Sequence, residues 1–366
     1  MPARGELLDR LGLRSPIIQA PMAGGGDSAA LVAAVNEAGG FGFVGAAYLT
    51  PAQLTDRARD IRSRTALPFG VNLFAPQPEP TASAALTEAA VMRVAGFYAE
   101  LGLPAPSAPA YPGDSFAALV PAMLDSGAAI FSVTFGLPPA DVVNAAKARG
   151  MRVMGTATTV AEALALEQAG VDAVIAQGAE AGGHRGGFIG DPAANLIGAM
   201  ALIPQIVDAV GVPVIASGGI MDGRGIAAAL ALGATAVQLG TVFLTCDEAG
   251  IPEVHKQAIL DAAILDAAED QTRLTRAFSG RPARGLVNRF METIEDRGQP
   301  DAVLPFPLQN ALTRPLRAAA GQQGRADFLS LWAGQGAPMA RRRPAGDVVA
   351  ALLSGCAATV EKLAGV

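Results

Sequence analysis

The sequence places one of its two histidines in a glycine-rich run where it could do chemistry. Residues 178–187 read GAEAGGHRGG, so five of the ten are glycine and His184 stands among them. An imidazole can hydrogen-bond an anion, or remove a proton, near neutral pH. The run follows the apolar segment 173–176, which predicts that His184 lies in a loop after a strand. The other histidine, His255, lies in a helical pattern and is predicted to be structural.

A second set of residues is suited to holding a phosphate group. One apolar run ends in Ser217, Gly218 and Gly219, with a short helix predicted soon afterwards, and the next run ends in Gly240 and Thr241. Because glycine has no Cβ, backbone N–H groups at such turns can converge on one phosphate, and a helix N-terminus adds further donors. The sequence therefore predicts a ligand that carries phosphate.

A third set favours a flavin as that ligand. The segment QAPMAGG at 19–25 lets Pro21 and Met22 present apolar surface and backbone to a flat ring. Asn72 and Gln177 are carboxamides at the ends of predicted strands, and a carboxamide can both donate to and accept from an isoalloxazine edge or a ribityl chain. A dinucleotide site would require a GxGxxG element after the first strand, and the sequence has none there.

The elements that position these residues are short runs that are apolar along their whole length, as in parallel strands covered on both faces. The predicted strands are 17–23, 42–46, 69–74, 129–135, 152–158, 173–178, 212–218 and 236–244. Helical patterns between them occupy 28–39, 51–64, 139–150, 159–170, 195–211 and 222–233. Eight such units predict an α/β protein with a TIM-type (β/α)8 barrel rather than an open doubly wound sheet.

Two segments interrupt the alternation of strands and helices. Within a barrel predicted over 1–245, residues 75–128 form a Pro-rich insertion around a helical stretch. After the eighth strand, residues 246–340 are predicted to form a smaller, mainly helical lid on the substrate side. Residues 341–366 are predicted to hold a helix that returns to the barrel.

Composition limits the partners and the chemistry. The net charge is −6 and no basic run exceeds 341–343, which argues against a nucleic-acid surface. No stretch approaches about 18 uninterrupted apolar residues and no signal peptide is evident, so a cytoplasmic protein without a membrane span is predicted. Cys246 and Cys356 are far apart in the sequence, which argues against a disulfide framework and a metal site. The loop after 173–178 has no thiol, which argues against a cysteine nucleophile there.

Taken together, five runs resemble the nitronate monooxygenase family, the FMN-dependent flavoenzymes formerly called 2-nitropropane dioxygenases. They are QAPMAGG, FGVNLF, GTATTVAEALALEQAGVDAVIAQGAEAGGHRGGF, PVIASGGIMDGRGIAAALALGA and VQLGTVFL. The resemblance spans at least residues 15–290. The later segments 284–290, 305–313 and 331–338 are similar to the bacterial class I branch. Enoyl-acyl-carrier reductases and NADH:quinone reductases share the same scaffold.

The resemblance implies an FMN site and a place for His184 beside the flavin and the substrate. Phe306 departs from the family pattern, in which a tyrosine often stands at that position, so any contribution of that hydroxyl would be missing. The residues predicted to hold FMN, including those of the phosphate turns and the loop glycines, are Pro21, Met22, Ala23, Asn72, Gln177, Gly182, Gly183, Ser217, Gly218, Gly219, Gln238, Leu239, Gly240 and Thr241.

The predicted activity is oxidation of alkyl nitronates, of the propionate 3-nitronate type, by FMN and O2 to a carbonyl compound and nitrite through a flavosemiquinone. His184 would stabilise the anion or remove the α-proton of a neutral nitroalkane. One alternative is an NAD(P)H-dependent reductase of a quinone or an enoyl thioester on the same barrel. Another is a flavin- or phosphate-binding sensor without activity. The predicted partners are a small anionic nitronate and O2, and the protein is predicted to be a monomer or a homodimer.

Overall fold

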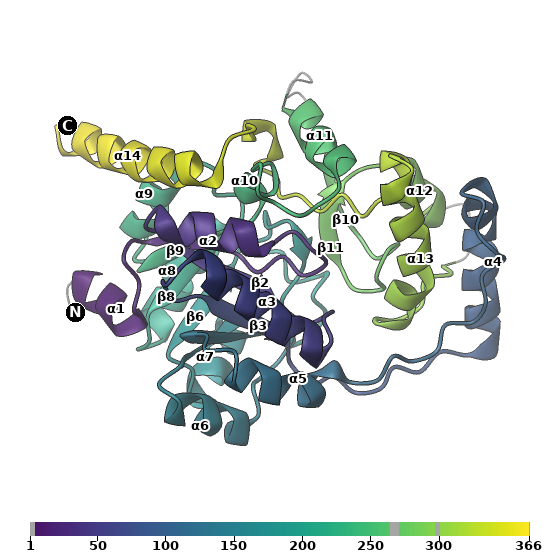
Figure 1. Ribbon diagram of the computed structural model, residues 1–366, viewed down its shortest axis with the longest axis horizontal. Helices are drawn as coiled ribbons and strands as arrows, with labels where there is room; N and C mark the ends of the chain where they lie inside the picture. Colours follow the sequence, from purple (N-terminus) through teal and green to yellow (C-terminus); the bar gives the residue numbers. More distant parts are fainter. Residues whose placement is uncertain (1–3, 264–270, 297–300, 366) are drawn as a thin grey trace.

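A closed barrel of eight parallel strands forms the centre of the computed structural model, which describes residues 4–263, 271–296 and 301–365 (Figure 1). The strands pair in the order β1-β2-β3-β4-β5-β6-β8-β9, and β1 closes the barrel by pairing with β9. The predicted (β/α)8 barrel is therefore confirmed. The barrel strands are β1 (Ile17–Gln19), β2 (Phe41–Gly45), β3 (Gly70–Phe74), β4 (Ile130–Thr134), β5 (Arg152–Ala157), β6 (Ala173–Gln177), β8 (Val214–Ser217) and β9 (Ala236–Leu239).

Helices cover the outside of the barrel, and several begin at residues that the sequence marks as caps. Thr50 and Gln53 form a reciprocal capping box at the start of one helix, with Pro51 at its first position. The Asp222 side chain accepts hydrogen bonds from two backbone N–H groups of the helix that follows it. The outer helices are α2 (Ala29–Glu37), α3 (Pro51–Arg64), α5 (Ser115–Leu124), α6 (Ala140–Ala148), α7 (Val160–Gln168), α8 (Ala199–Ala209) and α9 (Gly223–Ala231).

Two predicted strands are shorter than expected at their carboxyl ends. The first was expected over 17–23 and the last over 236–244, but β1 ends at Gln19 and β9 at Leu239. These two residues are each other's final partners in the ladder that closes the barrel. Instead, residues 241–244 form the short helix α10 (Thr241–Leu244). The apolar composition of 240–244 reflects burial rather than a strand.

Both ends of the chain pack against the barrel. Helix α1 (Arg4–Leu11) leads into Leu13, which belongs with Leu11 to the apolar cluster that includes the barrel residues Phe43 and Met154. The long helix α14 (Ala345–Ala364) lies along α9 and α2. Glycine makes the approach to α9 possible, since a Cβ at Gly223 would lie 2.1 Å from the backbone nitrogen of Cys356.

A second layer covers the carboxyl ends of the barrel strands (Figure 1). We call this layer the cap. It combines helices with a three-stranded antiparallel sheet in the order β10-β11-β7, in which β7 comes from the barrel loop that carries His184. The elements of the cap are α4 (Ala84–Glu100), β7 (Gly183–His184), α11 (Glu253–Ala262), β10 (Thr272–Thr275), β11 (Ala283–Leu286), α12 (Arg289–Ile294), α13 (Leu308–Gln322) and the 3-10 turns η1 (Ala326–Phe328) and η2 (Ala337–Met339).

The Pro-rich insertion at 75–128 is divided between the two layers. Helix α5 packs on α3 of the barrel, whereas α4 stands away from the barrel beside α13, at the end of two extended segments (Figure 1). The Tyr98 hydroxyl donates to the Leu312 carbonyl at 2.6 Å, and the Phe97 ring packs against Phe290 and Phe328. Helix α4 is thus part of the cap although it lies between two barrel strands in the sequence.

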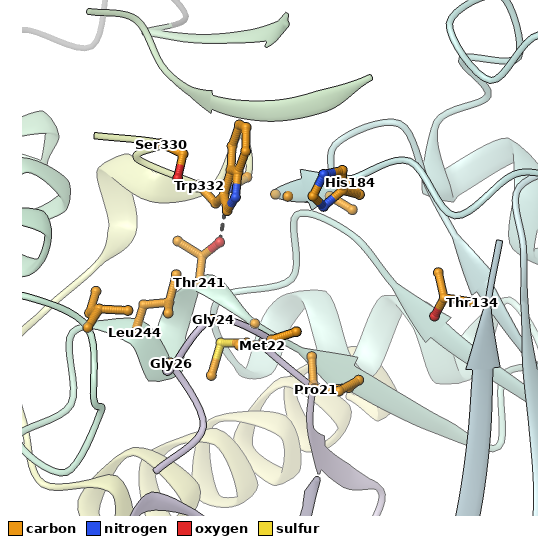
Figure 2. Close-up of a pocket in the computed structure, with 18 of the residues that line it drawn as sticks. Pro21, Met22, Gly24, Gly26, Thr134, His184, Thr241, Leu244, Ser330 and Trp332 are labelled. Carbon is orange, nitrogen blue, oxygen red and sulfur yellow. Dashed lines mark hydrogen bonds between the residues drawn. The ribbon is translucent and has the colours of Figure 1, made fainter. Parts of the chain in front are cut away.

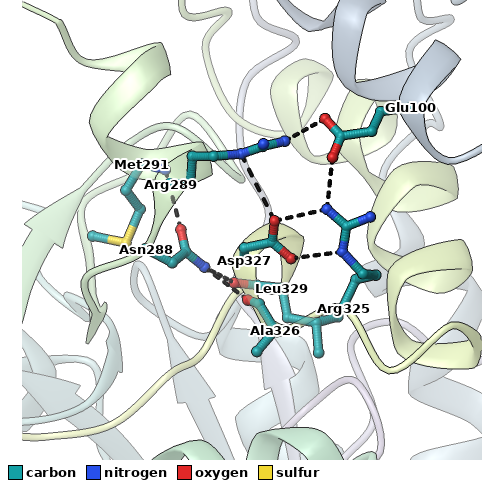
Figure 3. Close-up of polar contacts among 8 residues, drawn as sticks. All are labelled: Glu100, Asn288, Arg289, Met291, Arg325, Ala326, Asp327 and Leu329. Atoms are coloured by element: carbon teal, nitrogen blue, oxygen red, sulfur yellow. Dashed lines mark hydrogen bonds and ion pairs between the residues drawn. The ribbon is translucent and has the colours of Figure 1, made fainter.

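Ion pairs hold the end of α4 to the rest of the cap (Figure 3). The Arg325 guanidinium donates to Glu100 at 2.6 Å and to Asp327 at 2.9 Å, and Arg289 also pairs with Glu100. Asn288 caps α12 and donates to the Leu329 carbonyl at 2.8 Å. Since these ion pairs are partly exposed, they fix the orientation of α4 more than they add to stability. No helix among the described residues is long and apolar enough to cross a membrane.

Candidate active site

A cavity of about 660 Å³ lies between the carboxyl ends of the barrel strands and the cap. It brings together every residue that the sequence analysis selected for the site. These residues are Pro21, Met22, Ala23, Asn72, Gln177, Gly182, Gly183, His184, Ser217, Gly218, Gly219, Gln238, Leu239, Gly240 and Thr241. Figure 2 shows His184 and Trp332 on one side of this cavity and Pro21 and Met22 on the opposite side.

Strand register aligns three of the polar residues in one row. Gln177 at the end of β6 pairs with Ser217 of β8, and Ser217 pairs with Gln238 of β9. The Nε2 atom of Gln238 is buried and has no hydrogen-bond partner among the described residues. A buried donor without a partner is costly, so this row is suited to a ligand that brings an acceptor.

The two carboxamides at the ends of β3 and β6 are engaged to different degrees. Gln177 Nε2 donates to the His184 carbonyl at 3.1 Å, and its Oε1 accepts from the Gly186 N–H at 2.8 Å, so this side chain mainly shapes its own loop. Asn72 Nδ2 donates to the Ser132 hydroxyl at 2.9 Å. No hydrogen bond to Asn72 Oδ1 is formed within the described part of the chain, which leaves an acceptor for a ligand.

A buried aspartate that the sequence analysis did not select holds the loop after β1. Asp27 Oδ2 accepts from the backbone N–H groups of Met22 and Gly45, each at 2.6 Å, and Arg57 donates to the Asp27 carbonyl at 2.8 Å. Burial raises the pKa of this carboxyl to about 7, against the lowering effect of the two backbone N–H donors. The loop that carries Pro21 and Met22 is thereby fixed from behind.

Glycine is required at the turn after β8 and where the cap meets the barrel. Gly218 and Gly219 have φ angles of 114° and 70°, which other residues rarely adopt. At Gly182, a Cβ would lie 2.5 Å from the backbone nitrogen of Gly334. The Gly334 N–H in turn donates to Thr241 Oγ1 at 2.9 Å (Figure 2). The predicted cofactor residues Gly182 and Thr241 therefore also support the junction between barrel and cap.

The loop that carries His184 is held by buried charges. Within β7, Gly183 and His184 pair with Arg284 and Ala283 of β11. Arg185, which is fully buried, donates to the Gly178 carbonyl at 2.7 Å and to the Asn195 carbonyl at 3.2 Å. Residues 181–184 of the run GAEAGGHRGG thus form a fixed part of the cavity wall.

His184 lies in an aromatic environment with one polar neighbour. Its Nε2 is 2.9 Å from the Ser279 hydroxyl, and its ring centroid lies 5.6 to 6.5 Å from four aromatic rings. These rings belong to Phe74, Phe135, Phe306 and Trp332. Burial lowers the pKa of His184 to about 3, and the nearby positive charges of Arg281 and Arg317 add to the effect. The imidazole is therefore neutral at pH 7 and can donate or accept one hydrogen bond.

Phe135 shapes the same wall. Its φ of 77° is rare for a residue with a Cβ and marks a strained backbone position at the end of β4. The Arg281 guanidinium lies 3.9 Å above its ring. His255, predicted to be structural, lies at the edge of the cavity with its Nε2 3.3 Å from the Trp332 carbonyl, and burial lowers its pKa to about 4. His255 thus supports the segment that carries Trp332.

Several cavity residues were missed by the sequence analysis. Tyr48, Asn310, Arg314, Arg317 and Trp332 line the cavity with the residues described above. They come from the loop after β2, from α13 and from the segment before η2. Asn310 and Trp332 lie in the segments 305–313 and 331–338, whose resemblance to the family was noted without a site role for either residue. A basic and amphipathic pattern over 308–322 was available as a signal for Arg314 and Arg317. The described residues contain no group of three or more His, Cys, Asp and Glu side chains that could hold a metal ion.

Comparison with known proteins identifies the family. A family model described as nitronate monooxygenase matches residues 6–355. A probable nitronate monooxygenase of Bacillus subtilis is 41% identical over 336 residues, which cover 90% of this chain and 92% of the relative. A probable nitronate monooxygenase of Staphylococcus aureus strain Newman is 38% identical over 354 residues, which cover 96% and 97% of the two chains.

Solved structures agree with this result. A nitroalkane oxidase from Streptomyces ansochromogenes superposes with a TM-score of 0.89 at 43% identity, covering 98% of this chain and 99% of the other. FabK from Thermotoga maritima superposes with a TM-score of 0.75 at 30% identity, covering 98% of each chain. The identity to the first is higher, and the relatives named above carry the same family description as the matching model. This chain therefore belongs to the nitronate monooxygenase family of oxidoreductases.

Proposed function

We propose that this protein uses a bound FMN to oxidise alkyl nitronates with O2, giving a carbonyl compound and nitrite. The observation that carries the proposal is the single cavity in which His184, the glycine turns after β8 and β9, and the carboxamide row meet. Its volume of about 660 Å³ is within the range of small-molecule and cofactor sites. Membership of the nitronate monooxygenase family supports the substrate class.

The residues present fit FMN. The positive-φ turn at Gly218 and Gly219 and the start of α10 at Thr241 offer backbone N–H groups for a phosphate. The buried Nε2 of Gln238 is a donor and Asn72 Oδ1 is an acceptor, and each lacks a partner among the described residues. An isoalloxazine edge and a ribityl chain carry both kinds of complementary group. When bound, FMN supplies the electron transfer between the nitronate and O2.

The protein's own groups would bind and orient the nitronate. His184 is neutral at pH 7, so its role toward an anion is a directed hydrogen bond rather than charge neutralisation. The rings of Phe74, Phe135 and Phe306 around it keep bulk water from the reacting carbon. A nitronate already has electron density on its α-carbon, so no C–H bond has to break before oxidation. A neutral nitroalkane would first have to lose its α-proton to the imidazole.

The Ser279 hydroxyl determines which nitrogen of His184 carries the proton. If this hydroxyl donates to the Arg281 carbonyl at 3.1 Å, it accepts from Nε2–H and leaves Nδ1 as a base. If it donates to Nε2 instead, Nδ1–H can donate to a nitronate oxygen. The first arrangement suits proton removal from a nitroalkane, and the second suits binding of a nitronate.

The test is to mix the FMN-loaded protein without oxygen, first with propionate 3-nitronate and separately with NADH and NADPH. We expect the nitronate to bleach the flavin absorbance and, in air, to drive O2 uptake with release of nitrite. Rapid bleaching by NADH or NADPH, with no nitronate-dependent O2 uptake, would replace the proposal with a reductase of the kind considered above. Binding of FMN with no reaction toward any of the three would leave only a flavin-binding role.

A further inference from the structure

One peptide unit in the loop that carries His184 is held between a buried carboxylate and a guanidinium. The N–H of Phe188 donates to Glu162 Oε1 at 2.5 Å, and the carbonyl of the same unit, that of Gly187, accepts from Arg281 Nη2. Glu162 belongs to α7 and Arg281 to the turn between β10 and β11, so the barrel and the cap meet at this peptide. Neither side chain lines the cavity, so any effect on the reaction is transmitted through the loop.

Glu162 fixes the loop to the barrel. Its side chain is fully buried in the first turn of α7, and Oε1 also accepts from the Ile189 N–H at 2.9 Å. The other oxygen, Oε2, accepts from the Thr158 N–H at 2.6 Å and from the Thr158 hydroxyl at 2.8 Å. A Cβ at Gly187 would lie 2.5 Å from Thr158 Oγ1, so the close approach of the loop requires glycine. Four donors on one buried carboxylate therefore hold residues 187–189 at the start of α7.

Arg281 connects the same peptide to the surroundings of His184. Its Nε donates to the Arg185 carbonyl at 3.3 Å, and its guanidinium carbon lies 3.9 Å from the centroid of the Phe135 ring. The Ser279 hydroxyl lies 3.1 Å from the Arg281 carbonyl and 2.9 Å from His184 Nε2. Fixing Arg281 thus also fixes the turn that places Ser279 against the imidazole.

Arg281 also contributes charge at this place. Burial lowers its pKa to about 10, while the charge of Glu162 acts in the opposite direction, so Arg281 is positive at pH 7. The elements around His184 carry these titratable or charged groups: Tyr48, Arg185, His255, Arg281, Arg284 and Arg317. Of these, Arg281 and Arg317 lower the pKa of His184, after burial as the main cause.

We propose that Glu162 and Arg281 are positioning residues for the reaction at His184. By holding the peptide 187–188 from its two sides, they keep a positive charge and the Ser279 hydroxyl in fixed places beside the imidazole. Loss of Glu162 would release this peptide and with it the guanidinium. The inference rests on the proposed function for the role of His184, but the arrangement around the imidazole can be measured without turnover.

The first test is a pH titration of His184 by NMR. The chain has two histidines, so protein that is isotope-labelled in histidine alone gives two sets of ring signals, and His255→Gln assigns them. In the wild type we expect His184 to stay neutral down to about pH 4, since its pKa is about 3. In Arg281→Gln the pKa of His184 should rise, because one of the two positive charges is removed. The control is Arg149→Gln, an exposed arginine paired with Asp125.

The sign of the shift in Glu162→Gln separates positioning from simple charge. Removal of a negative charge by itself would lower the pKa of a nearby imidazole. Displacement of Arg281 would raise the pKa of His184, and this is the result that we expect. Gly187→Ala changes no charge but pushes the peptide away from Thr158, so it should shift the pKa in the same direction, and it tests the proposal even if Glu162→Gln does not fold. In the double variant Glu162→Gln/Arg281→Gln, the pKa should equal that in Arg281→Gln.

The second test measures turnover of a nitronate at pH 7. We expect kcat to fall about 10- to 100-fold in Glu162→Gln and in Arg281→Gln, with a smaller change in KM, because a displaced imidazole no longer meets the reacting atoms. Arg281→Lys keeps the charge without the planar fork and should recover part of kcat. The matched control is Glu167→Gln on the same helix, which also accepts a backbone N–H, that of Gly211 at 2.7 Å, but lies away from the cavity. It should leave kcat and the titration of His184 unchanged.

The outcomes separate this inference from the function on which it rests. An unchanged His184 titration in Arg281→Gln would overturn the role of Arg281. A pKa of His184 that falls or stays constant in both Glu162→Gln and Gly187→Ala would overturn the role of Glu162. Wild-type kcat in all of these variants would remove the link to the reaction. If the wild type oxidised no nitronate, the proposed function would fail, while the titrations would still decide whether the pair positions His184.

Discussion

His184 Nε2 lies 2.9 Å from the hydroxyl of Ser279, and this contact joins the loop after β6 to the turn between β10 and β11. The barrel and the cap therefore share the residue that we place beside the substrate. Because the same hydroxyl lies 3.1 Å from the Arg281 carbonyl, it can orient the imidazole in either of two proton arrangements. Position and proton placement at His184 both depend on a residue 95 positions away.

The first prediction concerns Ser279→Ala. Loss of the hydroxyl leaves His184 Nε2 without its partner, so the ring loses its fixed orientation. We expect kcat/KM for a preformed nitronate to fall about tenfold, corresponding to one buried hydrogen bond. The ratio of nitronate turnover to nitroalkane turnover should also change. A nitronate needs a proton on Nδ1 as a hydrogen-bond donor, whereas a nitroalkane needs Nδ1 without a proton as a base. Ser354→Ala, on the exposed part of α14, is the control and should alter neither quantity. An unchanged substrate ratio in Ser279→Ala would show that Ser279 only supports the fold.

The second prediction concerns pH and stability. The pKa values of His184 and His255 fall from 6.5 to about 3 and about 4, mainly through burial. Between these pH values and pH 6.5 the unfolded chain binds more protons than the folded one. The contribution of the two neutral histidines to the free energy of unfolding is therefore complete above pH 6.5 and is lost as the pH falls. The slope is about 1.4 kcal/mol per pH unit for each histidine at most.

Urea unfolding between pH 7 and pH 4 measures this effect. Asp27 acts in the opposite direction, because its raised pKa favours folding at low pH and this contribution is lost as the pH rises from 3.8 through about 7. The slope of the free energy of unfolding against pH should therefore be steeper in Asp27→Asn and flatter in His255→Gln than in the wild type. A slope that is the same in His255→Gln and wild type would contradict the assigned burial of this histidine.

The third prediction concerns the loop after β1. Asp27→Ala removes the acceptor of two buried N–H groups, those of Met22 and Gly45, which should cost about 2 kcal/mol or more of stability. Since this loop lines the cavity opposite His184, FMN should also dissociate more readily, and flavin fluorescence on dilution measures the release. Asp27→Asn keeps one acceptor oxygen and should retain most of the FMN affinity. Equal FMN affinity in Asp27→Ala and wild type would show that the loop does not contact the cofactor.

The fourth prediction concerns Gly182. A Cβ at this position would lie 2.5 Å from backbone atoms of the cap segment at 333–334, so Gly182→Ala forces the two layers apart. We expect a loss of about 1–3 kcal/mol in unfolding free energy. The matched control is Gly96→Ala in α4, where no atom lies within 4 Å of the added Cβ. Replacing this helical glycine should raise stability by about 0.5–1 kcal/mol. If Gly182→Ala were as stable as the wild type, the close approach would not be required.

Much of the barrel and of its cavity could be predicted from the sequence, because the information is local. Apolar runs that end in glycine or a carboxamide locate the strand ends, and parallel strands place those ends on one face. The same local reasoning was wrong for 240–244, where the apolar residues 241–244 are buried in the short helix α10 and not in a strand.

The residues that were missed act over long sequence distances. Asp27 reaches Gly45, Ser279 reaches His184, and Arg317 reaches the surroundings of Tyr48. No periodicity or spacing within one segment reveals such pairs. Gln177 shows the converse, since its place at the end of a strand was predicted correctly, yet its amide is largely committed to the loop that carries His184. Local pattern predicts where a side chain stands but not which partners it has.

Helix α4 sits in the cap although the chain reaches it from β3 and leaves it toward β4. The cap is therefore built from three stretches of sequence, α4, β7 and the elements after β9, with barrel strands between them. A truncation after β9 would leave α4 with its Phe97 and Tyr98 faces uncovered, because Phe290, Phe328 and Leu312 would be gone. For the same reason, exchanging substrate specificity between relatives calls for transplanting α4 together with the elements after β9, as one composite module.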